Sequence, residues 1–287
     1  MPRLLLVHHS ARSTPRSVTN AVVAGIVLAG LLLAGCTGRD GESPSPSASP
    51  SSTPSADASS PVPVPKPPRE GSCHRLTFDE AVAPTADHDA VKCRRKHTSQ
   101  TFRVGRLALG AGDDRRTVDS DRAQRQAARA CTGQLGRFLG ADREALRLSL
   151  LATVWFTPTV EEGEAGGRWF RCDVIATAGS RRLLPLPRRI QGALDDFALC
   201  ATSEPGHPDS RRIPCSQPHT WEALTTVDLP GTAYPSADRA ADTMADTCRA
   251  SARSAADDPL DFTWSEERPT RAQWKSGQRY GICWVPE

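Results

Sequence analysis

Cysteine and histidine give this 287-residue chain its clearest potential for chemistry. Nine cysteines occur, and two of them precede a histidine by four positions: Cys93 with His97, and Cys215 with His219. A zinc site tolerates this spacing. However, the sequence lacks the Cys-x-x-Cys pair of most structural zinc sites, and exported cysteines oxidise to disulfides whose sulfurs are not thiolate ligands. We therefore predict no metal. Each histidine should begin a strand and bond the preceding turn, with a role at a binding surface as the open alternative.

Patterns of known catalytic sites are missing from the sequence. It contains no Gly-x-Ser-x-Gly, Ser-x-x-Lys or His-Glu-x-x-His motif, which are arrangements that supply a nucleophile or a catalytic zinc. The neighbouring acids Asp257–Asp258 and Glu266–Glu267 are expected to be solvated loop charges rather than an acid–base pair. A formal net charge of +3 gives no strong electrostatic case for nucleic acid as a partner. We predict a protein that is not an enzyme and needs no cofactor.

Eight of the nine cysteines fall into two sets of four whose order repeats. Equivalent cysteines are offset by 127, 122, 117 and 111 residues, which is too long for a solenoid repeat. We therefore predict two tandem homologous domains, residues 71–180 (the first half) and 194–287 (the second half), joined by an arginine-rich connector, residues 181–193. The cysteines are Cys73, Cys93, Cys131 and Cys172 in the first half, and Cys200, Cys215, Cys248 and Cys283 in the second.

Each half is expected to be α+β, with a small antiparallel sheet covered on one face by a helix. Strands are predicted at 98–107, 148–156 and 168–176, and at 220–229, 261–265 and 279–285. Asp119 or Ser120, and in the second half Ser236, should cap helices that Gly140 and Pro259 close. The apolar stripes are predicted to be Ala127, Cys131, Leu135 and Phe138, and Ala241, Met244, Cys248 and Ala252.

Disulfides are expected in both halves, because domains of about 100 residues with few aromatic residues have small cores and need covalent crosslinks for stability. Four cysteines allow three connectivities. We favour the first cysteine with the second, and the helix cysteine with that of the last strand, so that no bridge joins the halves. Each bridge should contribute at most about 3 kcal/mol through the unfolded state. The favoured pairs are Cys73–Cys93, Cys131–Cys172, Cys200–Cys215 and Cys248–Cys283.

The amino-terminal residues are typical of an exported, lipid-anchored protein. Residues 1–35 have a basic start, no acidic residue and a short apolar run, as in a secretory signal peptide. The run ends in Leu33-Ala34-Gly35-Cys36, which resembles a bacterial lipobox and implies that Cys36 is diacylated. A simple signal peptide with an incidental cysteine is the alternative. Residues 36–70, rich in proline and serine, should form a disordered tether, which would hold the folded part at the extracytoplasmic face of the cell membrane.

Charge is distributed unevenly along the chain: net +3 in the first half, +4 in the connector and −6 in the second half. Beside an ordinary uneven surface, two interpretations stay open. The halves could dock with the connector at the seam, or the basic half and connector could face an anionic wall polymer or lipid headgroups. Leu183, Leu184 and Leu186 would be costly to leave in water, so we expect the connector to be a strap across an interface.

The second half also carries a family resemblance. Residues Cys215-Ser-Gln-Pro-His-Thr-Trp-Glu222, the helix with Cys248, and Trp274-x-x-Gly-x-Arg-x-x-x-Cys283 resemble the septum-formation family of exported bacterial proteins. The first half departs from the pattern, with Arg94-Arg95-Lys96 in place of Ser-Gln-Pro and Gly163 in place of the tryptophan. The resemblance implies an envelope location and a disulfide-bonded fold, and it implies no catalytic residue.

These observations predict a non-catalytic lipoprotein of the cell envelope, linked to septum formation by the resemblance. Its partner would be an envelope protein or wall polymer of unknown identity. His97, His219, Trp221 and Trp274 are the candidate residues of the binding surface, since aromatic anchors carry much of the energy of interfaces. The alternative function is an envelope enzyme or small-ligand binder that uses a groove between the two halves.

Overall fold

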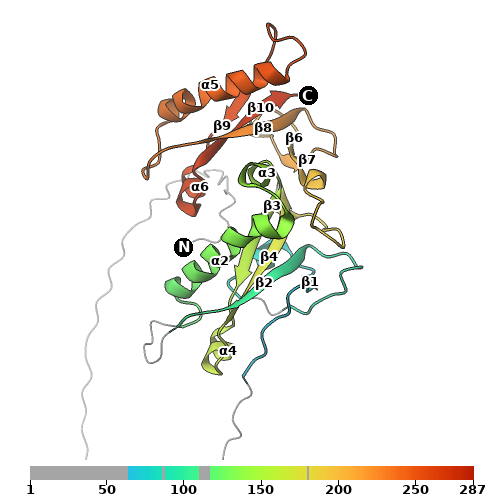
Figure 1. Cartoon of the computed structure of the whole chain (residues 1–287), viewed down its shortest axis with the longest axis vertical. Helices are drawn as coiled ribbons and strands as arrows, with labels where there is room; N and C mark the ends of the chain where they lie inside the picture. The colour runs from blue at the N-terminus through green and yellow to red at the C-terminus, as the bar shows by residue number, and fades with distance from the viewer. Residues whose placement is uncertain (1–63, 86–87, 110–116, 180) are drawn as a thin grey trace, which may run out of the picture. The chain divides into compact units, whose positions relative to one another are not determined.

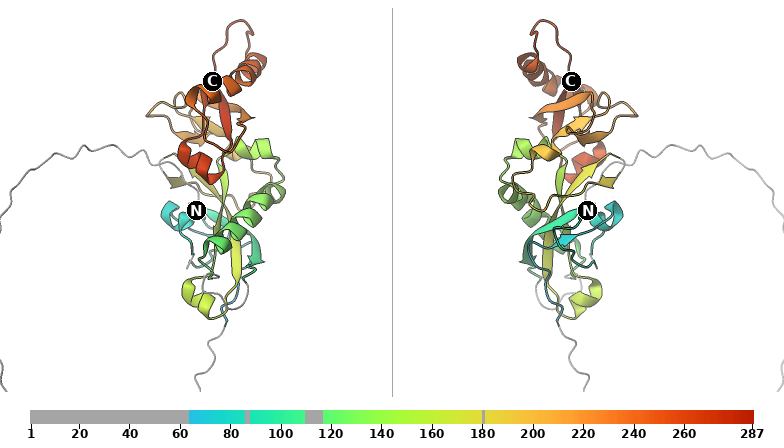
Figure 2. Two further views of the ribbon diagram at one scale, coloured as in Figure 1. Left: turned by 90° about the vertical axis from the view of Figure 1, so that its left-hand side faces the viewer. Right: turned by 90° about the vertical axis from the view of Figure 1, so that its right-hand side faces the viewer.

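The computed structural model describes residues 64–85, 88–109, 117–179 and 181–287 (Figures 1 and 2). The predicted signal peptide, Cys36 and nearly all of the predicted tether lie outside the described residues. The fold is α+β, with two five-stranded sheets in which every pair of neighbouring strands is antiparallel. None of the described helices is both long enough and apolar enough to cross a membrane.

The first sheet has the strand order β1-β2-β4-β3. Its strands are β1 (Cys73–His74), β2 (Ser99–Arg106), β3 (Leu151–Phe156) and β4 (Trp169–Ala178), and β5 (Arg182–Leu183) adds to β4. The long helix α2 (Asp121–Leu139) packs on β3 and β4. Three short helices complete this part: α1 (Phe78–Val82), α3 (Arg143–Arg147) and α4 (Val160–Glu164).

The second sheet has the order β7-β6-β8-β10-β9. Its strands are β6 (Leu199–Ala201), β7 (Arg212–Pro214), β8 (Trp221–Asp228), β9 (Ser265–Glu267) and β10 (Tyr280–Pro286). The helix α5 (Ala237–Ala255) packs on β8, β9 and β10. The short helix α6 (Arg271–Ser276) precedes β10, and a 3-10 turn (Asp195–Phe197) precedes β6.

The two sheets share their topology, since β6-β8-β10-β9 corresponds strand by strand to β1-β2-β4-β3. They also share an irregularity. Between β2 and β4 the pairing passes from Thr101 to Arg103 and leaves out Phe102. Between β8 and β10 it passes from Ala223 to Thr225 and leaves out Leu224. A bulge of this kind bends the strand and aims its side chains, and the sheets place it at the same point relative to their cysteines.

The sequence analysis predicted the capping residues of the long helices more accurately than it predicted their buried faces. Ser120 and Ser236 cap α2 and α5, and Gly140 ends α2 in a left-handed conformation with φ of 73°. Two expected stripe positions differ, however: Leu139 is buried in place of Phe138, and Ala240 in place of Ala241. In α5 the buried positions then recur every fourth residue, which keeps them on one face. Strand β9 begins at Ser265, where the prediction ended it.

Four disulfides are present, and they are the pairs that the sequence analysis favours: Cys73–Cys93, Cys131–Cys172, Cys200–Cys215 and Cys248–Cys283. Two of them tie a long helix to the central strand beneath it. The described residues belong to a single compact unit that contains all four bridges. We therefore expect this unit to fold without the residues that precede it.

The two sheets are joined through one hydrophobic cluster. Leu135, Val174 and Leu199 belong to it, as does Trp284 of β10. The connector contributes Leu184, Leu186 and Ile190, each nearly or fully buried in this cluster. The expectation of a connector that straps an interface is therefore confirmed, with its leucines rather than its arginines at the seam.

Candidate functional site

The two Cys-x-x-x-His segments fold into the same turn. In the first, the Arg95 amide donates to the Lys92 carbonyl at 2.8 Å, and the His97 ring is bonded through Nδ1 to the Arg95 carbonyl at 2.8 Å. In the second, the Gln217 amide donates to Pro214 at 2.9 Å and His219 Nδ1 bonds the Gln217 carbonyl at 2.8 Å. Each histidine thus fixes the turn that precedes its strand, as the sequence predicted.

Metal chemistry at these turns is limited by the disulfides. Cys200, Cys215 and His219 bring three ligand-type atoms within 4.8 Å of one another. Two of those atoms are the bonded sulfurs of the Cys200–Cys215 bridge, and a disulfide sulfur is not a thiolate ligand. The cluster is therefore accounted for by the bridge and by the turn that His219 closes.

The predicted aromatic binding surface is wrong for Trp274. This side chain is only 3% exposed, its indole Nε1–H donates to the Thr232 carbonyl at 3.1 Å, and its ring meets the edge of Tyr234. The capping box of α6 starts that helix at Thr270 and turns Trp274 inward, against α5. His97 is also buried, and Trp221 is half-buried against the shared cluster. These residues do not form an exposed patch.

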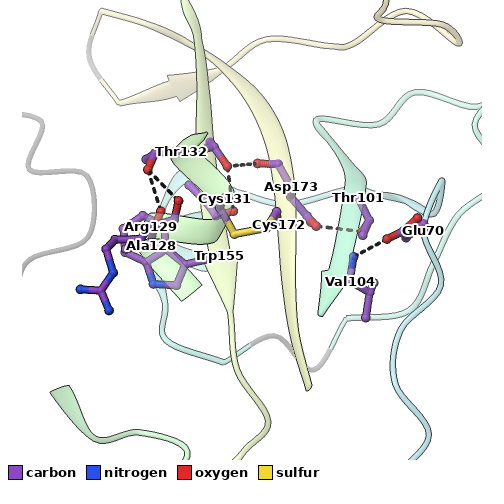
Figure 3. Close-up of a disulfide and its surroundings, with 12 residues drawn as sticks. Glu70, Thr101, Val104, Ala128, Arg129, Cys131, Thr132, Trp155, Cys172 and Asp173 are labelled. Atoms are coloured by element: carbon purple, nitrogen blue, oxygen red, sulfur yellow. Dashed lines mark hydrogen bonds between the residues drawn. A yellow bond between two sulfur atoms is a disulfide. The ribbon is translucent and has the colours of Figure 1, made fainter. Parts of the chain in front are cut away.

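A buried polar network crosses the first sheet. The Asp173 carboxylate accepts a hydrogen bond from the Thr101 hydroxyl at 2.8 Å (Figure 3). It also accepts from the Ser99 hydroxyl at 2.6 Å and pairs with Arg171 at 3.2 Å. His74 Nε2 lies 3.5 Å from the Thr101 hydroxyl. Burial, followed by the nearby Arg171 cation, lowers the pKa of His74, so that its neutral form is favoured at neutral pH.

This network contains serine, histidine and aspartate but does not have the geometry of a catalytic triad. The Ser99 hydroxyl donates to the carboxylate, whereas a nucleophilic serine needs a histidine as its base. Ser99, Thr101 and Asp173 are fully buried, and Arg171 nearly so. The network therefore stabilises the sheet. The sequence analysis missed it, although the charged pair on either side of Cys172 was a visible signal in an otherwise apolar strand.

Cations gather on the exposed side of the first Cys-x-x-x-His turn. The Leu186 amide donates to the His97 carbonyl at 2.9 Å and so holds the connector beside this turn. A shallow cavity of about 480 Å³ lies there, lined by Lys92, Cys93, Arg94 and Arg188. The basic loop surface, as we name it, consists of the exposed residues Lys92, Arg94, Arg95, Lys96, Arg188 and Arg189.

The sequence analysis considered the basic half and the connector as regions that could face an anionic wall polymer or lipid headgroups, but it did not predict that these two clusters of charge meet. Arg94-Arg95-Lys96 appeared only as a departure from the family pattern, and Arg188–Arg189 only as part of the connector's charge. The structure brings the two together, because the connector returns along the first sheet before it enters the shared cluster.

A second unpredicted feature is the contact of α3 with β8. The Glu144 carboxylate accepts hydrogen bonds from the Thr225 hydroxyl, the Thr226 amide and the Thr226 hydroxyl, at 2.9, 2.7 and 2.5 Å. Arg147 pairs with Asp228 at 2.7 Å and lies over the Tyr280 ring at 4.1 Å. This short helix is therefore a polar clamp between the two sheets, beside the apolar seam.

Replacing Glu144 with alanine should lower the free energy of unfolding by about 1–3 kcal/mol, because three donors lose a charged acceptor in a half-buried contact. Chemical denaturation with the disulfides intact would measure this change. Glu144→Gln keeps one carbonyl oxygen and should lose less. Glu164→Ala, at an exposed position of α4, is the control and should stay within about 0.5 kcal/mol of the wild type. Equal effects at Glu144 and Glu164 would contradict the clamp.

Comparison with known proteins gives one match. A family model described as septum formation matches residues 70–283, which begins next to the first disulfide and ends at Cys283. No curated protein and no solved structure matches the chain significantly. The matched region includes the first sheet, the second sheet as far as Cys283 of β10, all four disulfides, the basic loop surface and the α3 clamp.

Proposed function

Because this chain belongs to the septum formation family, we propose that it is a non-catalytic interaction module of the cell envelope that acts at sites of septum formation. In this proposal Cys36 is lipidated at the extracytoplasmic face of the membrane, and residues 36–70 tether the folded unit. The observation that carries the proposal is the family match together with the eight cysteines of the folded unit, all of which are oxidised. Stable disulfides are typical of proteins outside the cytoplasm.

We further propose that the two halves arose by duplication. The corresponding sheets have the same strand order, and each has its bulge at the same distance from the Cys-x-x-x-His turn. In each half one bridge joins the long helix to the central strand. The halves have diverged at their centres, where Arg171 and Asp173 correspond by register to Ile282 and Trp284.

The non-catalytic part of the proposal is favoured by where the reactive side chains lie. Among the described residues, Ser99, Asp173 and His74 are committed to a buried network. A catalytic or ligand-binding groove between the halves would need open space at the seam. The described seam is instead filled by apolar side chains, which include Leu184, Ile190 and Trp284.

The anchor is testable in cells that express the full chain. We expect the wild-type chain to fractionate with membranes and to incorporate a clickable fatty acid. Cys36→Ala should lose the label, because the thiol that would carry the acyl chains is gone. Retention of label in Cys36→Ala would contradict lipidation at this residue.

The interaction role is testable in the same cells by chemical crosslinking and partner identification. We expect the wild-type chain to capture an envelope protein of the division site, with a lower yield from Cys36→Ala at equal abundance. Hydrolysis of cell-wall fragments by the purified chain, without any envelope partner, would instead favour an enzyme.

A further inference from the structure

We propose that the basic loop surface docks onto the anionic phospholipid headgroups of the membrane. The six cations would then hold this side of the first half against the membrane. The choice of a membrane as the anionic surface rests on the proposed anchor at Cys36. The affinity of the basic loop surface for anionic lipid does not rest on that anchor. It can be measured on a chain that lacks Cys36.

The cations of this loop are not required for its fold. The turn from Lys92 to His97 and the turn from Pro214 to His219 share the same backbone hydrogen bond, the same histidine contact and an adjacent disulfide. Yet the second turn has Ser216, Gln217 and Pro218 where the first has three cations. Because the uncharged sequence folds into the same turn, the charges need an explanation outside the loop.

The six side chains are also available to a ligand. All of them are exposed, and none has an ion-pair partner within the described part of the chain. Arginine and lysine are the residues that most often bind phosphate, by paired hydrogen bonds and as a point charge respectively. Arg94, Lys92 and Arg188 converge on the shallow cavity of about 480 Å³, which has room for a phosphate group.

The length of chain between the folded unit and Cys36 favours a membrane over a wall polymer. The Gly71 amide donates to the Thr101 carbonyl at 2.8 Å, and the Glu70 carboxylate accepts from the Val104 amide at 2.8 Å (Figure 3). The Gly71 carbonyl oxygen lies 3.4 Å from Cys93 Sγ, next to Arg94. From Gly71 back to Val64, however, the chain runs along β2 towards its Arg106 end and reaches Gly166, away from the basic loop surface (Figure 1). Residues 36–63 would then join Val64 to the anchor, and a flexible coil of 28 residues spans about 30 Å. An anchor at Cys36 would therefore keep the basic loop surface within reach of the bilayer.

Charge asymmetry favours the same orientation. The first half and connector together carry net +7, from +3 and +4, whereas the second half carries −6. An anionic membrane attracts basic segments near its surface and repels acidic ones, and the effect falls off within a Debye length of about 10 Å. The net charge of the whole unit is small, so this attraction depends on where the cations lie.

The proposal is tested with the folded unit, residues 64–287, and lipid vesicles. We expect it to co-sediment with vesicles of phosphatidylcholine that contain about one third phosphatidylglycerol, and not with pure phosphatidylcholine. The variant Arg94→Ser, Arg95→Gln, Lys96→Pro copies the second turn. It should bind the anionic vesicles about a hundredfold more weakly, since three cations are removed. Binding by the wild type should weaken as the salt concentration rises.

A matched control removes the same charge elsewhere. Arg122→Gln, Arg129→Gln, Arg137→Gln changes three exposed arginines of α2 and should bind almost as well as the wild type. Thermal unfolding and mass mapping of Cys73–Cys93 establish that the loop variant is folded. A second variant, Arg188→Gln, Arg189→Gln, changes only the connector side and should also bind less.

Equal losses in the loop variant and the α2 variant would overturn the docking surface, as would binding that ignores lipid charge. If the folded unit bound soluble polyglycerol phosphate more tightly than anionic vesicles, the surface would be assigned to a wall polymer. The proposal that it docks onto the membrane would then be overturned. The folded unit used in the vesicle experiment lacks Cys36. If the full chain failed to incorporate the fatty acid in cells, the proposed anchor would be rejected, and the lipid affinity measured with vesicles would still stand.

Discussion

Replacing Asp173 with alanine is expected to lower the free energy of unfolding by about 3–5 kcal/mol, the cost of leaving one partner of a buried ion pair alone. The substitution removes the countercharge of Arg171 and the acceptor of the Ser99 and Thr101 hydroxyls. Arg171 would keep its contact over the Phe156 ring, at 4.5 Å, but would lose its described countercharge. Urea denaturation of the folded unit, with the disulfides intact, measures the loss.

Two variants separate the charge from the hydrogen bonds. Asp173→Asn retains a carbonyl oxygen that can accept from one of the two hydroxyls, so it should be less damaging than Asp173→Ala. Arg171→Met removes the cation and leaves both hydroxyl bonds to Asp173 in place, so its effect measures the cost of a buried carboxylate that lacks its countercharge. If Asp173→Ala lost under about 1 kcal/mol, water or a neighbouring group would have to replace the carboxylate, and the network would not stabilise the sheet.

The second half explains why such a network is not required by the fold. By register with Cys283, the positions of Arg171, Asp173 and Thr101 are taken by Ile282, Trp284 and Ala223, which are buried apolar residues. Replacement of a buried ion pair by well-packed apolar side chains is often neutral or stabilising. The two sheets, which share their strand order, therefore differ at their centres: one has a buried polar network and the other has apolar packing.

The sequence was most informative where the signal is local or repeated. Ser120 and Ser236 cap the long helices at the predicted positions, and the repeated cysteine order pointed to the disulfide pairs that the structure contains. Such features depend on a few neighbouring residues or on comparison of the chain with itself. The antiparallel sheets follow from strands joined by short connections and a crossing helix.

Features that depend on contacts between distant segments could not be predicted in this way. Glu144 meets Thr225 and Thr226 across about 80 positions of sequence, and no local pattern marks either side of that contact. Trp274 looked like an aromatic anchor, but its exposure depends on how α6 packs against the segment with Thr232 and Tyr234 that precedes α5. The basic loop surface combines two charged segments that only the path of the connector brings together.

Removing the helix disulfide of the first half, by Cys131→Ala with Cys172→Ala, is expected to lower the free energy of unfolding by about 4 kcal/mol. This exceeds the limit of about 3 kcal/mol expected from the sequence, because that figure applies to a loop of about 15 residues. The bridge closes a loop with a sequence separation of 41, and its loss returns the corresponding entropy to the unfolded chain. Both cysteines are replaced so that no free thiol remains. Differential scanning calorimetry with parallel urea titrations measures the change.

The hydrophobic cluster that joins the two sheets determines whether the loss of stability affects one sheet or both. Leu135 of α2 and Trp284 of β10 belong to the same hydrophobic cluster, so loosening α2 should destabilise both sheets in a single transition. The matched variant, Cys248→Ala with Cys283→Ala, opens a loop of separation 35 and should cost nearly the same, again about 4 kcal/mol. Two separate transitions, with the untouched half unchanged, would mean that the seam does not couple the halves. A single lowered transition in both variants would mean that the connector and α3 make one cooperative unit of two similar sheets.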